Sequence, residues 1–368
     1  MKKAITYLKN EPVLIIAWIL ALASMFIVPP DSAYAGYIDT HTLALLFCLM
    51  GVMASLQGIG FFRRAGEILL QKTRTSRQLE AVLIFLCFIS SMLITNDVAL
   101  ITFVPFALEA LRMAKLEKRI IPVVVMQTIA ANLGSMATPI GNPQNLYLYS
   151  HYYLSAGTFF SVSLPYVAFS AVLLAVFILL KKPQPVCPPT AETKIISTRT
   201  HLATLAVLFL ICLCAVAHIL NVWLVLGIVA ICLLILDRRC LLHVDYALLA
   251  TFAGFFVFIG NLGRVPAFSD FLRSILEGRE VLVAIAASQA LSNVPCALLL
   301  SGFTENALAL VIGTNLGGLG TLIASMASLI SFKRIGIEYP NLRGRYLGYF
   351  TVANIVFLAF LLGLWLLL

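Results

Sequence analysis

The chain has 368 residues, of which 61% are hydrophobic and only 11% are charged, and its formal net charge is +9. A soluble domain carries about 25% charged residues, whereas apolar runs long enough to cross ~30 Å of hydrocarbon recur along this whole sequence. The composition therefore excludes a soluble protein and predicts an all-α polytopic membrane protein.

Nine apolar segments are predicted to cross the membrane. The first follows three lysines and resembles a signal peptide, with "SAYAG" as a possible cleavage site, but we expect it to be retained because another spanning segment follows at once. The predicted crossings are 12–29, 40–58, 120–145, 159–180, 201–219, 222–236, 246–262, 305–332 and 346–368. Two further apolar stretches, 79–112 and 281–303, are too long for one simple helix and are interrupted by polar residues, so both are predicted to be re-entrant hairpins.

The basic residues support this layout through the positive-inside rule. With a cytoplasmic N-terminus and hairpins that cross nothing, the cytoplasmic loops hold all of the 25 Lys and Arg residues except Arg264, Arg273 and Arg279. Those loops are 1–11, 62–78, 112–119, 181–199, 237–240 and 333–345. The positive charge thus indicates topology and argues against a nucleic-acid partner. The same rule places the C-terminus outside. We expect the membrane to be a bacterial inner (plasma) membrane.

Two parts of the sequence resemble each other weakly. "LITNDVAL" followed by "TIAANLGSMATPIGNPQN" resembles "ALSNVPCAL" followed by "VIGTNLGGLGTLIASMAS". The alignment pairs Asn96 with Asn293, Asn132 with Asn315, Gly134 with Gly317 and Thr138 with Thr321. Because the two hairpins would enter from opposite faces, this pattern predicts an inverted-repeat secondary transporter. The predicted organisation is an N-terminal repeat at 1–180, a cytoplasmic linker at 181–200 and a C-terminal repeat at 201–368.

One segment of each repeat is rich in glycine and asparagine at membrane depth. Segments 120–145 and 305–332 are therefore predicted to be broken helices, with bare carbonyls at one broken end and bare N–H groups at the other. Carbonyl, Asn and Thr oxygens suit a hard cation such as Na⁺, and helix N-termini suit an anion. We expect Na⁺ to bind at Asn96, Asp97 and Asn132.

Asp97 is the most informative single residue, because a carboxylate at membrane depth is costly and usually functional. Asn96 beside it is also an ordinary helix N-cap residue, so capping alone is the alternative for Asn96. No Lys or Arg lies inside any crossing, so an anion would be neutralised by helix N-termini and a co-bound cation. The predicted substrate- and ion-binding residues are Thr95, Asn96, Asp97, Asn132, Gly134, Thr138, Gly141, Asn142, Ser292, Asn293, Asn315, Gly317 and Thr321.

These motifs resemble those of the ion transporter superfamily, which includes arsenite permeases, NhaD-type sodium–proton antiporters and citrate or dicarboxylate transporters. The resemblance covers about residues 40–365. It implies two inverted repeats whose hairpins and broken helices hold cation and substrate, often in a homodimer that moves a core past a scaffold. Dicarboxylate members carry Ser-Asn-Thr at both hairpin tips, whereas these tips read Thr95-Asn96-Asp97 and Ser292-Asn293-Val294. The tips therefore depart from the pattern of two equivalent sodium sites.

The expected function is secondary active transport of a small anion, a carboxylate or an oxyanion, coupled to Na⁺ or H⁺. A Na⁺/H⁺ antiporter and an arsenite-type efflux permease are the alternatives, and a channel is a further one because two opposed hairpins can also frame a pore. An enzyme is disfavoured, since aspartic intramembrane proteolysis needs two deep carboxylates and Asp97 is one alone. We expect no cofactor other than the coupling ion, and no partner other than the small ion substrate, the lipid bilayer and a second copy of the chain.

Overall fold

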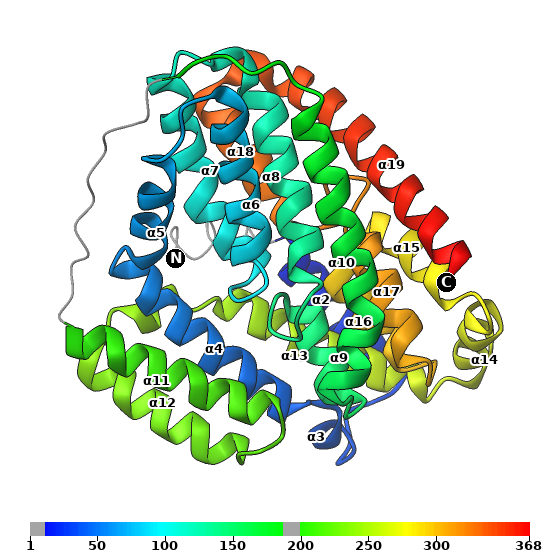
Figure 1. Ribbon diagram of the computed structural model, residues 1–368. Coiled ribbons are helices and arrows are strands. Elements are labelled where there is room, and N and C mark those ends of the chain that lie inside the picture. The colour runs from blue at the N-terminus through cyan, green and yellow to red at the C-terminus, as the bar shows by residue number, and fades with distance from the viewer. Residues whose placement is uncertain (1–11, 187–198) are drawn as a thin grey trace.

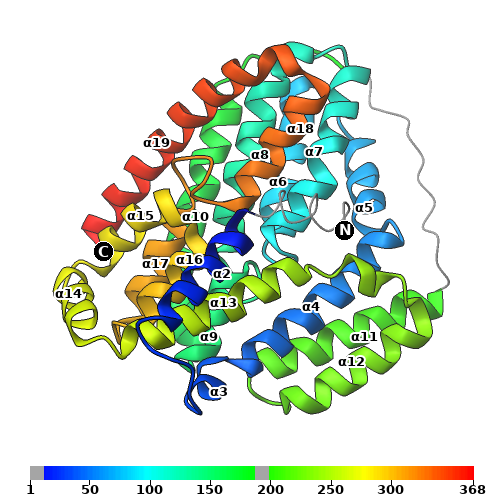
Figure 2. The same cartoon turned by 180° about the vertical axis from the view of Figure 1, so that it is seen from behind.

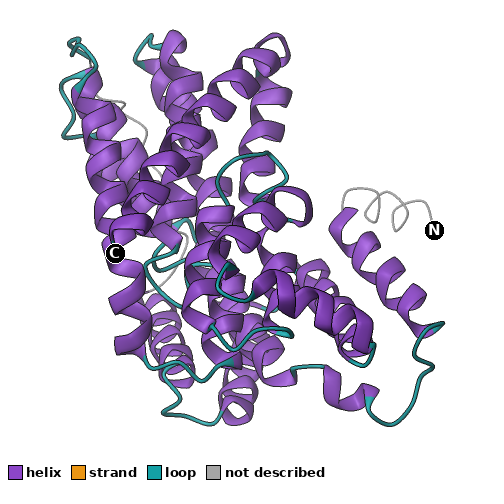
Figure 3. Cartoon of the chain, turned by 90° about the vertical axis from the view of Figure 1, so that its right-hand side faces the viewer, coloured by secondary structure: helices purple, strands orange, loops and turns teal. Residues whose placement is uncertain are grey.

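The computed structural model describes residues 12–186 and 199–368, and all regular structure in these residues is helical (Figure 3). The prediction of an all-α protein is therefore confirmed. Four segments are long and apolar enough to cross a membrane alone: α4 (Thr40–Gly58), α10 (Ala156–Leu179), α13 (Tyr246–Gly263) and Pro340–Leu367, which ends in α19 (Arg343–Leu367). The other apolar helices are shorter, so the count of nine crossings stays a prediction.

The remaining helices follow the order expected from the sequence. Before α10 they are α2 (Pro12–Met25), α3 (Tyr34–Tyr37), α5 (Phe61–Leu70), α6 (Ser76–Ser90), α7 (Asn96–Met113), η1 (Glu117–Arg119), α8 (Ile120–Ser135) and α9 (Pro143–His151). After α10 they are α11 (Arg199–Val216), α12 (Val222–Asp237), η2 (Cys240–His243), α14 (Pro266–Leu276), α15 (Glu280–Leu291), α16 (Asn293–Ser301), α17 (Ala307–Gly317), α18 (Met326–Glu338) and η3 (Pro340–Leu342). The sequence analysis missed α5 and α14, which precede the first and second predicted hairpins.

The four interrupted segments break at their polar residues. Helices α6 and α7 are separated by 91–95, and α15 and α16 by Ser292 alone. Helices α8 and α9 are separated by 136–142, and α17 and α18 by 318–325. The predicted ends of the broken helices were too early, since α9 continues to His151 and α18 to Glu338. Buried polar residues open α9, so the apolar pattern stops before the helix does. Whether the hairpins turn back inside the membrane stays a prediction.

The helices form two groups that meet along α9 and α16. In the first group, the hairpin helices contact the broken helices: α6 and α7 lie on α8, and α15 and α16 lie on α17 (Figures 1 and 2). Helix α10 lies beside α19 in the same group. In the second group, α2 lies across α13, while α11 and α12 lie side by side against α4. Helix α4 contacts α9, and α13 contacts α16. We call the first group the core and the second group the scaffold.

Small residues let α2 and α13 approach closely within the scaffold. Ala17 and Ala21 are fully buried, and a Cβ added at Gly254 would lie 3.2 Å from that of Ala17. The Trp18 indole nitrogen donates to the Ala250 carbonyl over 3.1 Å. Close contact at small residues, supplemented by a hydrogen bond, is typical of helix pairs in membranes.

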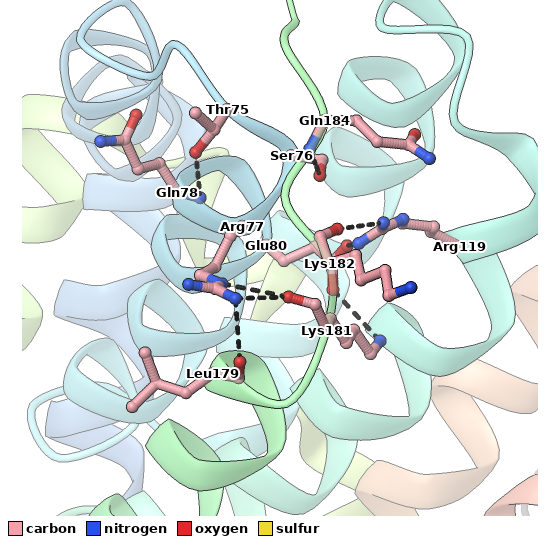
Figure 4. A network of polar contacts seen from close by, with 10 residues as sticks. All are labelled: Thr75, Ser76, Arg77, Gln78, Glu80, Arg119, Leu179, Lys181, Lys182 and Gln184. Atoms are coloured by element: carbon pink, nitrogen blue, oxygen red, sulfur yellow. Dashed lines mark hydrogen bonds and ion pairs between the residues drawn. The ribbon is translucent and has the colours of Figure 1, made fainter.

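A charged network fixes one end of the core, the upper end in Figure 1. Glu80 is fully buried at the start of α6 and forms ion pairs with Arg119 and with Lys181, whose Nζ lies 3.1 Å from its Oε2 (Figure 4). Arg77 donates to the carbonyls of Leu179 and Lys181 in the same network. Burial lowers the pKa of Lys181, and the Glu80 carboxylate acts in the opposite direction. The basic residues of three predicted cytoplasmic loops thus meet at one end of the molecule. Part of the predicted linker 181–200 lies outside the described residues.

Candidate functional site

Each hairpin tip is tied to the unwound loop of the broken helix in its own repeat. The backbone N–H of Asn96 donates to the Gly141 carbonyl over 3.1 Å, and that of Asn293 donates to the Ala324 carbonyl over 2.9 Å. The hydroxyl of Thr138 donates to the carbonyl of Met92, and the hydroxyl of Thr321 to the carbonyl of Gln289. These bonds fall at equivalent positions of the two aligned sequences. Both hairpin tips are therefore held against an unwound loop in the same way.

A cluster of asparagine side chains joins the two broken helices. Asn142 Nδ2 donates to Asn315 Oδ1 over 2.9 Å, and Asn315 Nδ2 donates to Asn145 Oδ1 over 2.6 Å. Asn132 accepts a bond of 3.0 Å from the Ser325 hydroxyl and lies 3.5 Å from the Ser328 hydroxyl. We call Asn132, Asn142, Asn145, Asn315 and Ser325 the carboxamide cluster. All five are at most 4% exposed.

The bonds of this cluster recur as matched pairs. In the sequence alignment Asn132 pairs with Asn315, and the same register pairs Asn142 with Ser325. The bond from Asn142 to Asn315 therefore has its counterpart in the bond from Ser325 to Asn132. Each repeat supplies an acceptor from the first half of its broken helix and a donor from the start of the second half. Matched contacts between halves are what a repeated fold produces.

The two predicted tip asparagines lie in different surroundings. Asn96 donates from Nδ2 to Asn132 Oδ1 over 3.1 Å, and its own Oδ1 accepts from the Asp97 backbone over 3.0 Å. Thr95, rather than Asn96, caps α7 by accepting from the Val98 backbone. The Asn293 amide lies beside Gly318, and its Oδ1 is 3.5 Å from the Ser292 hydroxyl. Asn96 thus joins the carboxamide cluster directly, and Asn293 stands at its edge.

Ser292 forms the tip of the second hairpin with an unusual backbone. Its φ is 74° and its ψ is 152°, a region that glycine adopts readily and other residues rarely do. The same residue is 1% exposed. Strain of about 1–3 kcal/mol accompanies such a conformation. Strained residues of this kind collect at ligand clamps and switch regions, so the prediction of a site at this tip gains support.

Four helices begin around the cluster. Helices α7 and α16 start at the two hairpin tips, and α9 and α18 start where the broken helices resume. Helix N-termini carry partial positive charge and unpaired backbone N–H groups. Within residues 12–186 and 199–368, no Lys or Arg side chain bonds to the cluster. The positive potential at the cluster therefore comes from backbone dipoles.

The bare carbonyls predicted to hold Na⁺ accept amide hydrogens instead. Asn145 Nδ2 donates to the carbonyls of Ser135 and Thr138 over 3.3 and 3.2 Å. Gln289 Nε2 donates to those of Gly317 and Leu319 over 3.1 and 3.0 Å. The last carbonyls of α8 and α17 are thus engaged by side-chain amides of the chain itself. In the described part of the chain, no group of three His, Cys, Asp or Glu side chains is placed to hold a metal ion.

The three residues predicted to bind Na⁺ are not all in one place. Asn96 and Asn132 are hydrogen-bonded to each other, whereas Asp97 lines a separate cavity of about 350 Å³ between core and scaffold. Gln57 of α4 and His243 and Asp245 of the scaffold line the same cavity. Asp97 therefore stands where the core faces the scaffold, one residue away from the cluster. Sodium binding by Asn96, Asp97 and Asn132 stays a prediction.

The predicted glycines bring elements together. An added Cβ at Gly134 would lie 2.1 Å from the Phe88 carbonyl oxygen, and one at Gly317 would lie 2.6 Å from Ser288 Oγ. A Cβ at Gly141 would lie 2.1 Å from the Ser135 carbonyl oxygen. Gly134 and Gly317 thus let each broken helix touch its hairpin, and Gly141 lets the first loop close on itself. The hydroxyls of Thr138 and Thr321 hold the hairpin turns, and the Thr138 carbonyl accepts from Asn145 of the cluster.

The sequence analysis missed several polar residues of the site. Asn145, Ser325 and Ser328 enter the cluster, Gln289 supports the second loop, and Gln144 is buried at the start of α9. Asn145 and Gln144 were within the quoted segment "GNPQN", and Ser325 and Ser328 were within "IASMAS". Extending the alignment by a few residues pairs Asn142 with Ser325 and Asn145 with Ser328. That longer alignment would have indicated these residues as equivalent positions of the site.

This chain is similar in sequence to proteins that are described as transporters and membrane proteins. The sequence model of a family described as citrate transporters, CitMHS, matches residues 4–307. The uncharacterized transporter MJ0456 of Methanocaldococcus jannaschii is 32% identical over 89% of this chain and 88% of its own length. The inner membrane protein YbiR of Escherichia coli is 30% identical over 84% of each chain. The silicon efflux transporter LSI3 of rice is 37% identical over 33% of this chain and 24% of its own.

Proposed function

Since this chain belongs to the citrate transporter family, and is therefore an integral membrane transporter and not an enzyme, we propose that it is a secondary active transporter for a small anion. The anion is a carboxylate or an oxyanion, and its movement is coupled to Na⁺ or H⁺. The observation that carries this proposal is the carboxamide cluster, in which Asn142 of one broken helix bonds to Asn315 of the other over 2.9 Å. A ligand bound there contacts both repeats at once.

The surroundings of the cluster favour an anion. Four helix N-termini start around it, and each contributes the positive end of a helix dipole. Asparagine side chains add amide donors without adding a fixed charge. A site of this kind binds an anion without the strong attraction that a buried Lys or Arg would give, which favours release on the other side of the membrane.

Coupling to a cation follows from the same absence of fixed charge. An anion held only by dipoles leaves a net negative charge at membrane depth, and such a charge is costly. A cation that binds together with the anion removes that cost. Asp97, one residue from Asn96, lines the cavity between core and scaffold and is suited to hold Na⁺ or a proton in turn.

The position of Asp97 also favours a second candidate, a Na⁺/H⁺ antiporter. Asp97, His243 and Asp245 line the same cavity, and side chains of these types exchange protons or bind cations. In an antiporter these groups alone bind the transported ions, and the carboxamide cluster is structural. The two candidates therefore differ in which residues a transport assay should depend on.

Reconstituted protein distinguishes the candidates. Proteoliposomes are given a panel of carboxylates and oxyanions, with an imposed Na⁺ or pH gradient, and uptake is measured with and without an ionophore that collapses the gradient. The proposal predicts accumulation of at least one anion above its external concentration, and loss of that accumulation when the gradient is collapsed. Sodium movement without any anion uptake identifies an antiporter. Flux that follows the membrane voltage alone identifies a channel.

A further inference from the structure

We infer that Gln144 contacts the transported ligand and selects an anion that carries a hydroxyl group beside an acceptor oxygen; this rests on the proposed function. Gln144 lies in the first turn of α9, between Pro143 at the wall of the cavity and Asn145 in the carboxamide cluster. One helical turn later, the Tyr147 hydroxyl meets Ser301 of α16 over 2.8 Å. The neighbours of Gln144 in α9 therefore contact the cavity, the carboxamide cluster and α16.

The side chain of Gln144 is buried without partners. It is 1% exposed, and within the described part of the chain neither its amide nitrogen nor its carbonyl oxygen has a hydrogen-bond partner. Buried polar groups are almost always paired, and an unpaired carboxamide destabilises the folded state. The four asparagines of the cluster, also buried, are all hydrogen-bonded to one another or to serines. Among the buried side-chain amides of the described residues, Gln144 is the one in which both polar atoms are unpaired.

Gln127 shows what a structural glutamine looks like in this fold. It is fully buried in α8, and its Nε2 donates to the carbonyls of Leu83 and Phe103 over 3.1 and 3.4 Å, while its Oε1 is without a partner in the described part of the chain. Its amide therefore joins α8 to α6 and α7. Gln144 makes no such connection, so packing of α9 does not account for its polar end.

The chemistry of a carboxamide restricts the ligand. Its NH₂ group needs an acceptor and its carbonyl needs a donor, and turning the amide over does not change this requirement. A fully ionised carboxylate or oxyanion without a hydroxyl group offers acceptors alone and would leave the carbonyl facing a negative oxygen. An anion that keeps one O–H beside an acceptor oxygen satisfies both atoms, whether that O–H belongs to a protonated acid group or to an alcohol.

Sodium is the weaker partner for the Gln144 carbonyl. A Na⁺ ion needs several further oxygens, and two nearby carbonyls, those of Ser135 and Thr138, already accept from Asn145. A hydroxyl proton needs one acceptor only. The ligand class is therefore a small carboxylate or oxyanion that retains at least one hydroxyl group.

The test compares Gln144→Met with Gln127→Met, each of which replaces a buried carboxamide by an apolar side chain of similar length. Citrate and tricarballylate, the same tricarboxylate without the hydroxyl group, serve as probes in proteoliposomes, with thermal unfolding measured on the same preparations. We expect the wild type to take up citrate at least tenfold faster than tricarballylate. Gln144→Met should lower uptake at least tenfold without lowering the unfolding temperature, and Gln127→Met should lower the unfolding temperature.

Two results overturn the inference alone while leaving the transporter proposal intact. One is wild-type uptake by Gln144→Met. The other is a fall in its unfolding temperature as large as that of Gln127→Met, which makes Gln144 a structural residue. Failure of the wild type to move any probe or other acid of the panel overturns the proposed function and this inference together.

Discussion

Replacing Gly134 by alanine should separate the first hairpin from the first broken helix. The new Cβ would lie 2.1 Å from the Phe88 carbonyl oxygen and 2.6 Å from Ser91 Oγ. Backbone atoms of α6 cannot rotate away, so α6 and α8 must move apart by roughly 1 Å, and overpacking of this kind costs about 1–3 kcal/mol or more. Because α6 leads directly to the tip at Thr95 and Asn96, we also expect uptake to be lost.

The equivalent change at Gly317 should destabilise the protein less, and a second substitution should restore the lost stability. There the nearest atoms belong to the Ser288 side chain, at 2.6 and 2.8 Å, and the Ala284 carbonyl oxygen is 3.2 Å away. Adding Ser288→Gly to Gly317→Ala should therefore recover most of the lost stability. Adding Ser91→Gly to Gly134→Ala should recover little, because the Phe88 carbonyl remains. The stability that each double variant recovers relative to its single variant measures the coupling between the two residues. The contact distances predict a larger recovery for Gly317 with Ser288 than for Gly134 with Ser91.

Thermal unfolding of detergent-purified protein measures these effects, with Gly363→Ala as the control. Gly363 lies in α19 with open space around its Cα, so alanine there should leave stability unchanged or raise it by about 0.4–1 kcal/mol. An unfolding temperature of Gly134→Ala equal to that of the control would refute the reasoning. Equal rescue of both repeats by their serine-to-glycine partners would refute the claimed difference between them.

Three further predictions concern charge and strain. Asp97→Asn should abolish Na⁺- or pH-dependent accumulation while leaving some substrate exchange, as measured by uptake across a pH series; unchanged dependence would make Asp97 structural. Glu80→Gln should lower the free energy of unfolding by about 3 kcal/mol, since it leaves two cations without their buried partner, each still 18–20% exposed; a shift below ~1 kcal/mol would contradict this. Ser292→Gly should raise the unfolding temperature, because relief of about 1–3 kcal/mol of strain exceeds the entropy cost of glycine; a lower temperature would show that the tip is not strained.

The interruptions of the helices could be predicted from local chemistry. Asn and Gly in "NLGSMATPIGNPQN" and "TNLGGLGTL" cannot continue an apolar helix at membrane depth, and the chain breaks in both stretches. The equivalence of Asn132 and Asn315 in the two repeats could also be predicted, since it follows from the alignment of the two sequences. Both asparagines lie in the cluster that joins the broken helices.

The partners of these residues could not be predicted in the same way. Which donor meets Asn132 or Asn315 depends on how the two halves pack, and that packing brings together residues far apart in the sequence. The roles of Gly134 and Asp97 likewise depend on tertiary contacts, since one lies against the hairpin and the other faces a cavity. Gln144 is distinguished by its lack of partners in the described structure, which no sequence pattern reports.

The central claim is that a ligand binds between the two repeats at the carboxamide cluster. Concentrative uptake by Asn132→Ala and Asn315→Ala proteoliposomes tests it most directly, with monodisperse, folded protein as the condition for each comparison. We predict that either change abolishes accumulation, because each removes one side of a site that both repeats build. Accumulation at the wild-type level in both variants would contradict the claim and reduce the cluster to a structural contact.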